Sequence, residues 1–85
     1  MYHTYVLYSK KYDKIYIGQT NNMEIRFEKH NAGKIRSTKP YLPWIKIYSE
    51  FFLTRSEAMK REKELKSHQG RTYIREKILK EYLSW

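Results

Sequence analysis

The stretch that decides the fold is YHTYVLYSKKYDKIYIG, residues 2–18. Along its first part the even-numbered side chains fall on one face of a strand and the odd-numbered ones on the other, while residues 15–17 predict a second strand. The polar segment between them predicts a turn. In an antiparallel hairpin with an even number of loop residues, Tyr5 and Tyr16 lie on the same face. Two phenol groups are therefore expected to converge on one surface.

The middle of the chain predicts one helix and one more strand. Gly18 is expected to close the second strand, and Asn21 or Asn22 offers a cap for a helix over Met23–Asn31. Residues 44–51 are rich in β-branched and aromatic side chains, which predicts a third strand.

Two further helices are expected in the last third of the chain. Thr54 and Glu57 fit a capping box that begins a helix over residues 55–68, ending near Gly70. A final helix is expected from Thr72, because apolar residues recur there at helical spacing. These residues are Ile74, Ile78 and Tyr82. The predicted fold class is α+β, a small three-stranded antiparallel sheet flanked by helices in the order ββαβαα.

Composition limits the classes of function. The 85 residues are expected to form a single domain over 1–85, and 18 basic against nine acidic residues give a net charge of +9. Such a charge favours nucleic acid or an anionic membrane as partner. The sequence has no cysteine, no apolar run of the ~20 residues that a membrane span needs, and no start typical of a signal peptide. A soluble cytoplasmic protein is therefore expected.

A carboxylate interrupts an apolar stripe in the predicted 55–68 helix. Ala58, Glu62 and Leu65 share one face, so Glu62 falls where a buried apolar residue is expected. A charge in such a place is usually paired, hydrogen-bonded or bound to a metal. A simple ion pair with Lys66, one turn later, is the ordinary interpretation.

The preceding helix carries Arg26 and His30 one turn apart. A guanidinium grips phosphate through two hydrogen bonds, and an imidazole transfers protons near neutral pH. Together with two tyrosines and one carboxylate in a basic chain, they form a plausible set for phosphodiester cleavage. A single carboxylate suits Mg²⁺, which keeps several of its water ligands.

A basic segment, residues 33–40, follows the same helix. Gly33 is expected to take the left-handed conformation that ends a helix, and the rest predicts a flexible loop. Its charge suggests contact with phosphate. The predicted nucleic-acid-binding residues are Lys34, Arg36, Lys39 and, on the later helix, Lys66.

This ordered set resembles the GIY-YIG nuclease family, especially its small single-domain bacterial members related to the nuclease domain of the bacterial nucleotide-excision repair enzyme. Tyr5 stands at the family's first-motif tyrosine, and Tyr16-Ile17-Gly18 reproduces the second motif. Arg26 lies ten residues beyond Tyr16, with His30 one turn later. The residues around Glu62 are similar to the family's metal-binding helix.

Two places depart from the family pattern. His3-Thr4 replaces the Gly-Ile of the first motif, at positions that shape the strand more than the chemistry. The late asparagine of homing-type members is absent. Ser67, His68 or Gln69 are the polar residues that stand near its place.

The resemblance implies a hydrolase with a single divalent ion, Mg²⁺ or Mn²⁺, held by Glu62. Arg26 would neutralise the scissile phosphate, and Tyr5 or Tyr16 would deprotonate the attacking water. Tyr5 is the preferred base, assisted by Tyr16 and His30. Gly18 would leave the groove free of a side chain or serve only as a turn residue.

The leading functional hypothesis is a metal-dependent DNA endonuclease, related to DNA repair, that selects strand structure rather than sequence. Base readout usually needs a dedicated helix, ribbon or second domain. RNA stays open as a substrate, because nothing in the chain announces a 2′-hydroxyl contact. The alternatives are a nucleic-acid-binding module with the same fold and little cleavage, and a structural role in which the tyrosines only fill the core.

Overall fold

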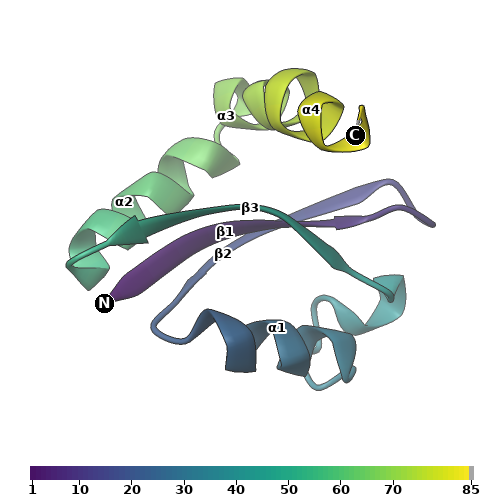
Figure 1. The fold of residues 1–85 in the computed structure, drawn as a ribbon, viewed down its shortest axis with the longest axis horizontal. Helices are drawn as coiled ribbons and strands as arrows, with labels where there is room; N and C mark the ends of the chain where they lie inside the picture. The colour runs from purple at the N-terminus through teal and green to yellow at the C-terminus, as the bar shows by residue number, and fades with distance from the viewer. Residues whose placement is uncertain (85) are drawn as a thin grey trace.

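The computed structural model describes residues 1–84 and has a three-stranded antiparallel sheet between two layers of helix (Figure 1). The strands, in the spatial order β2-β1-β3, are β1 (Tyr2–Ser9), β2 (Lys14–Thr20) and β3 (Ile45–Phe52). One face carries α1 (Met23–Asn31) and the short helix η1 (Lys39–Tyr41). The other carries α2 (Arg55–Lys66), α3 (His68–Tyr73), the π-helix η2 (Ile74–Leu79) and α4 (Lys80–Leu83). The predicted α+β class and the three-stranded antiparallel sheet are confirmed.

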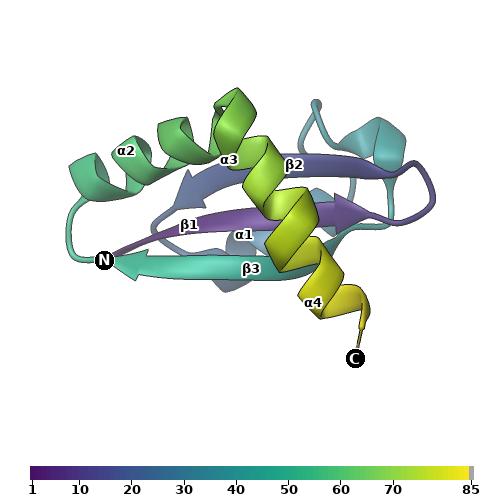
Figure 2. The same ribbon diagram turned by 90° about the horizontal axis from the view of Figure 1, so that it is seen from above.

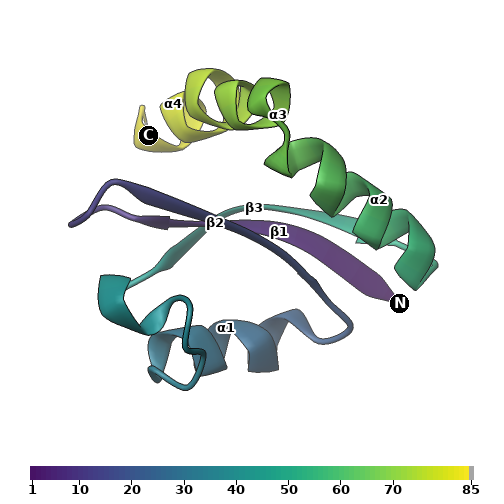
Figure 3. The ribbon, with the colours of Figure 1, turned by 180° about the vertical axis from the view of Figure 1, so that it is seen from behind.

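The central strand β1 separates two cores. On the α2 face, an apolar cluster joins strands and helices. Its members are Val6, Ile17, Leu65, Ile74 and Ile78. Seen from above, α2 lies on the β2 side and the following helices cross the sheet toward β3 (Figure 2). Figure 3 shows α1 against the opposite face of the sheet. On that face Tyr5 and Leu7 pack with Met23 and Trp44. The alternation predicted for β1 is therefore confirmed.

The hairpin places both tyrosines on one face, as predicted. Tyr5 pairs with Gly18 and Leu7 pairs with Tyr16, so both tyrosines point to the α1 face. The prediction that Gly18 closes the second strand was wrong, because β2 continues to Thr20. A glycine stands inside this strand because the side chain of Tyr5 lies across it.

Helix α1 has the predicted bounds. Asn22 is its cap, accepting a hydrogen bond from the backbone N–H of Ile25 at 3.2 Å. Gly33 has a φ of +72°, the left-handed conformation expected there. The side chain of Asn31 then makes two hydrogen bonds, of 2.7 and 2.9 Å, with the backbone of Trp44. These bonds fix α1 to the start of β3.

Helix α2 ends two residues earlier than predicted. Ser67 has an extended backbone, and its hydroxyl donates to the carbonyl of Glu64 at 2.6 Å and accepts from the N–H of Gly70 at 3.1 Å. It therefore closes α2 and caps α3. The prediction that the helix ends near Gly70 was wrong, because Gly70 lies inside α3. A Cβ there would come 2.2 Å from the carbonyl oxygen of Glu64, so only glycine lets α3 pack against the end of α2.

The last helical segment begins at His68 rather than Thr72. Ile74 and Ile78 are buried as predicted, but Tyr82 is 41% exposed and Leu79 is buried instead. The wider turn of η2 changes the helical phase after residue 78, which carries Tyr82 away from the sheet. Among residues 1–84, no helix has the length and apolar character to cross a membrane.

Candidate active site

Tyr5 lies at the centre of the residues that the sequence singled out. Its side chain is fully buried, and its hydroxyl is 2.9 Å from Nε2 of His30 on α1. The ring of Tyr16 is 6.2 Å from the ring of Tyr5 and 4.9 Å from that of His30, centroid to centroid. Strands β1 and β2 and helix α1 thus bring these three side chains together.

Gly18 makes room for this arrangement. A Cβ at position 18 would lie 2.6 Å from the Tyr5 hydroxyl and 3.1 Å from the ring of Tyr16. Any side chain would force the phenol away from His30. Gly18 is therefore not a turn residue, because it lies inside β2 and its missing side chain leaves room for the Tyr5 phenol.

His30 is held on its other side by Thr38, a residue that sequence reasoning missed. Nδ1 of His30 is 2.8 Å from the Thr38 hydroxyl, which also lies 3.3 Å from the carbonyl oxygen of Ile35. When the Thr38 hydroxyl donates to the carbonyl of Ile35, its oxygen accepts a hydrogen bond from Nδ1–H of His30. Nε2 of His30 is then an acceptor for the Tyr5 hydroxyl. In this arrangement the Tyr5 hydroxyl, both ring nitrogens of His30 and the Thr38 hydroxyl each have a hydrogen-bond partner.

Burial sets the charge state of both ring systems. Desolvation, with a contribution from Arg26, lowers the pKa of His30 from 6.5 to about 4, so the imidazole is neutral at physiological pH. Burial raises the pKa of the Tyr5 phenol to about 12. The Arg26 guanidinium lowers this pKa in part, while the charges of Tyr16 and Glu62 raise it. A neutral phenol therefore faces a neutral imidazole.

Arg26 lies one turn before His30 on α1 and is half-buried. Its Nε is buried and has no hydrogen-bond partner among the described residues. Because its charge acts on the pKa of both Tyr5 and His30, the guanidinium stands beside this pair. A phosphate oxygen is a suitable acceptor for this unpaired N–H of Arg26.

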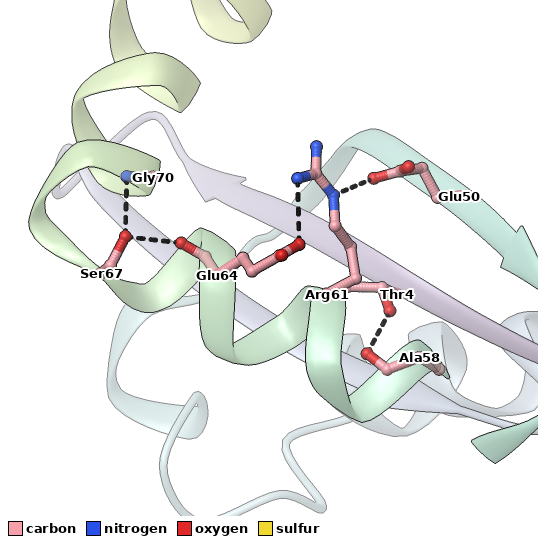
Figure 4. A network of polar contacts seen from close by, with 7 residues as sticks. All are labelled: Thr4, Glu50, Ala58, Arg61, Glu64, Ser67 and Gly70. Carbon is pink, nitrogen blue, oxygen red and sulfur yellow. Dashed lines mark hydrogen bonds and ion pairs between the residues drawn. The ribbon is translucent and has the colours of Figure 1, made fainter. Parts of the chain in front are cut away.

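Two polar contacts with the sheet position α2 (Figure 4). This helix carries Glu62. The buried Thr4 hydroxyl donates to the carbonyl of Ala58 at 2.7 Å, one turn before Glu62. Three residues later, Nε of Arg61 donates at 2.6 Å to the carboxylate of Glu50, which pairs with Thr4 across β1 and β3. Thr4 stands where the family motif has isoleucine, so this departure gives β1 a direct bond to α2.

Glu62 is 22% exposed in its side chain and forms an ion pair with Lys66 at 2.9 Å. The structure thus contains the ion pair with Lys66 that was the ordinary interpretation of Glu62 within the apolar stripe. Its charge nevertheless reaches the Tyr5 phenol, whose pKa it raises. Glu62 therefore lies within electrostatic reach of Tyr5.

The donor set fits a cation that uses few protein ligands. Among residues 1–84, no three His, Asp or Glu side chains gather to hold a metal ion by themselves. Mg²⁺ and Mn²⁺ sites in phosphoryl-transfer enzymes commonly combine one or two carboxylates with water and substrate phosphate. Glu62 can hold such an ion once Lys66 turns toward solvent.

The basic segment after α1 is more ordered than predicted. Lys34, Arg36 and Lys39 are exposed, as a phosphate-contacting surface requires. Thr38 between them is fully buried, and its carbonyl accepts from the Trp44 indole N–H at 2.9 Å. The segment thus belongs to the core of the site as well as to its rim.

The residues considered for the missing asparagine do not join this centre. The Ser67 hydroxyl is committed to the junction of α2 and α3. His68 and Gln69 are exposed on α3.

Fold and site together define a GIY-YIG domain. Residues 1–77 match the family model of the GIY-YIG catalytic domain, so the chain belongs to the GIY-YIG family.

The chain is similar to small proteins of the UPF0213 group. It is 42% identical over 71 residues to UPF0213 protein SH2523 of Staphylococcus haemolyticus, covering 82% of this chain and 80% of that protein. It is 40% identical over 67 residues to UPF0213 protein SA0446 of Staphylococcus aureus, covering 78% of this chain and 76% of that one. The solution NMR structure of UPF0213 protein BH0048 from Bacillus halodurans has the same fold, with a TM-score of 0.53, 28% identity and coverage of 87% and 82%.

Proposed function

We propose that this protein is a divalent-metal-dependent endonuclease that hydrolyses DNA phosphodiester bonds and selects strand structure rather than sequence. The observation that carries the proposal is the buried Tyr5–His30 hydrogen bond beside Arg26, whose buried Nε has no hydrogen-bond partner among residues 1–84. Hydrolysis needs a group that takes a proton from water and a cation that neutralises the phosphate. These three residues supply both.

Tyr5 is the proposed base. It would take a proton from water as its own hydroxyl proton passes to Nε2 of His30, leaving an imidazolium whose Nδ1–H is held by Thr38. The pKa of His30 is low partly because of the charge of Arg26. A phosphate bound to Arg26 would offset that charge and make His30 a better acceptor.

The buried state of Tyr5 sets a condition on this step. Its hydroxyl is inaccessible in the free protein, and Arg26 is one of the neighbours that act on it. We expect the substrate phosphate to draw the guanidinium toward itself and admit water to Tyr5. Tyr16, which is half-buried, is the alternative base.

Glu62 would hold the divalent ion, together with water and phosphate oxygens. Mg²⁺ or Mn²⁺ bound there would supply positive charge to the phosphate and to its 3′ leaving oxygen. Release of Lys66 from Glu62 would leave an ammonium free to contact the nucleic-acid backbone, in agreement with its predicted role.

The test is cleavage of end-labelled single-stranded, duplex, flap and branched DNAs with Mg²⁺ or Mn²⁺. Wild type is run beside Glu62→Gln and beside Glu76→Gln, an exposed glutamate on η2, as the matched control. Products that require metal, persist in the control and vanish in Glu62→Gln would support the proposal. An RNA panel run in parallel tests the alternative substrate.

A binding module that does not cleave is the second candidate, favoured by the Glu62–Lys66 ion pair. Among residues 1–84, only Arg61, Lys66 and Arg75 form ion pairs with acidic residues, which leaves most of the positive charge to solvent. This candidate predicts salt-dependent binding of the whole panel without products under any metal.

A further inference from the structure

A small polar cavity lies where β2 ends and α1 and α2 begin, at the end of the molecule that also holds the N-terminus (Figure 1). Its volume is about 260 Å³. The lining residues are Tyr2, Gln19, Thr20, Asn21, Arg26 and Arg55. It is thus bordered by two guanidiniums and by amide and hydroxyl groups, with no carboxylate in its lining.

Neither arginine of this cavity forms an ion pair with residues 1–84. Nε of Arg26 is also buried without a hydrogen-bond partner among these residues. Two like charges that face one cavity repel each other, and an anion between them removes this cost. The forked guanidinium and the carboxamides of Gln19 and Asn21 are donors that match phosphate oxygens.

Arg26 also joins the cavity to the proposed catalytic centre, because it lines the cavity and lies one turn before His30 on α1. Its charge acts on the pKa of both Tyr5 and His30. An anion in the cavity would therefore sit next to the scissile phosphate rather than on a remote surface. Successive phosphates along one nucleic-acid strand are neighbours in this way.

We propose that the cavity binds a second backbone phosphate of the nucleic-acid strand, adjacent to the scissile one, with Arg55 as its principal ligand. The identity of the ligand as a nucleic-acid phosphate rests on the proposed function. Arg55 is then a binding residue that sets how the strand lies across the site.

The first test is binding, measured without metal so that cleavage plays no part. Affinity for a short single-stranded DNA is determined over a range of salt concentrations for wild type, Arg55→Gln and Lys80→Gln, an exposed control on α4. We expect Arg55→Gln to weaken binding about tenfold. The slope of log K against log salt should become shallower by about 0.7, the value for one phosphate contact to a single strand. Equal behaviour of the two variants would overturn the proposal.

The second test identifies the phosphate. A neutral methylphosphonate is placed at each linkage in turn, and the affinities of wild type and Arg55→Gln are compared. We expect one linkage at which the modification weakens binding to wild type but not to the variant. If no linkage has this property while inorganic phosphate still shifts the side-chain amide NMR signals of Gln19 and Asn21, the cavity takes a free phosphate and the proposal is wrong.

These outcomes are separate from those of the cleavage assay. A protein that fails to cut but shows the Arg55-dependent linkage is a binding module with this phosphate site. A protein that cuts but shows no Arg55 dependence keeps its nuclease function and loses the inference.

Discussion

The two faces of the sheet bury their side chains by different means. On the α2 face, Val6 packs with Leu65 and Ile74 in an apolar cluster. On the α1 face, Tyr5 and His30 are buried to the same degree but are joined by hydrogen bonds. A buried polar group costs free energy unless it is bonded, so the second face depends on a complete network. The first face stabilises the fold, and the second holds groups that can exchange protons.

Strand β1 contributes to both faces at successive residues. Thr4 bonds to the carbonyl of Ala58 on α2, and Tyr5 bonds to His30 on α1. A change on the α1 face should therefore affect mainly the cleavage rate, and a change on the α2 face mainly the stability. A change at Thr4 should affect the placement of Glu62.

The largest expected effect is on chemistry and comes from the polar face. Tyr5→Phe should lower the cleavage rate by about 10²–10⁴-fold, because the proposed base is lost while the ring remains. Single-turnover rates with saturating protein measure this. Tyr16→Phe is the matched variant, and a larger loss from it than from Tyr5→Phe would assign the base to Tyr16.

The apolar face should respond in the opposite manner. Leu65→Ala should lower the free energy of unfolding by about 2–5 kcal/mol, because it leaves a cavity in the Val6–Ile74 cluster. The rate per folded molecule should stay close to that of wild type. Urea unfolding and single-turnover cleavage at low temperature measure the two quantities, and a rate loss comparable to that of Tyr5→Phe would break the contrast between the faces.

The polar face should also make stability depend on pH. His30 binds a proton near pH 4 in the folded state and near 6.5 in the unfolded state, so the unfolded state binds more protons between these values. Stability from this group is therefore full above pH 6.5 and falls by about 3 kcal/mol as the pH drops to 4. His30→Gln should remove this part of the slope in urea titrations. An unchanged slope would show that His30 does not titrate in this way.

The smallest effect is expected at Thr38. Thr38→Val should cost about 1–2 kcal/mol of stability, because Nδ1–H of His30 loses its acceptor. Thr38→Ser keeps the hydroxyl and should restore both stability and the His30 tautomer, which ¹⁵N chemical shifts of the imidazole report. If valine leaves the tautomer unchanged, Thr38 does not set it.

The sequence predicted those features that depend on local patterns. Alternation in residues 2–8, together with a hairpin loop of even length, was enough to place Tyr5 and Tyr16 on one face. A cap at Asn21 or Asn22 and Gly33 beyond the end gave the bounds of α1. The shared helix face of Arg26 and His30 was predicted from their spacing of four residues. In these cases the residues that determine the structure are close together in the chain.

The errors concern residues whose role depends on a distant neighbour. Gly18 and Gly70 were expected to end their elements, but each lies inside one because another side chain or backbone passes close to it. Thr38 lies in a segment predicted to be a flexible loop, and only the packing against His30 and Trp44 shows its place. No local pattern carries these contacts.

The most direct test of the central claim is a double-mutant cycle between Tyr5→Phe and His30→Gln, read in single-turnover cleavage rates. If Tyr5 and His30 move one proton as a unit, the double variant should be about as slow as the slower single variant. Additive losses, or full activity in either single variant, would contradict the claim.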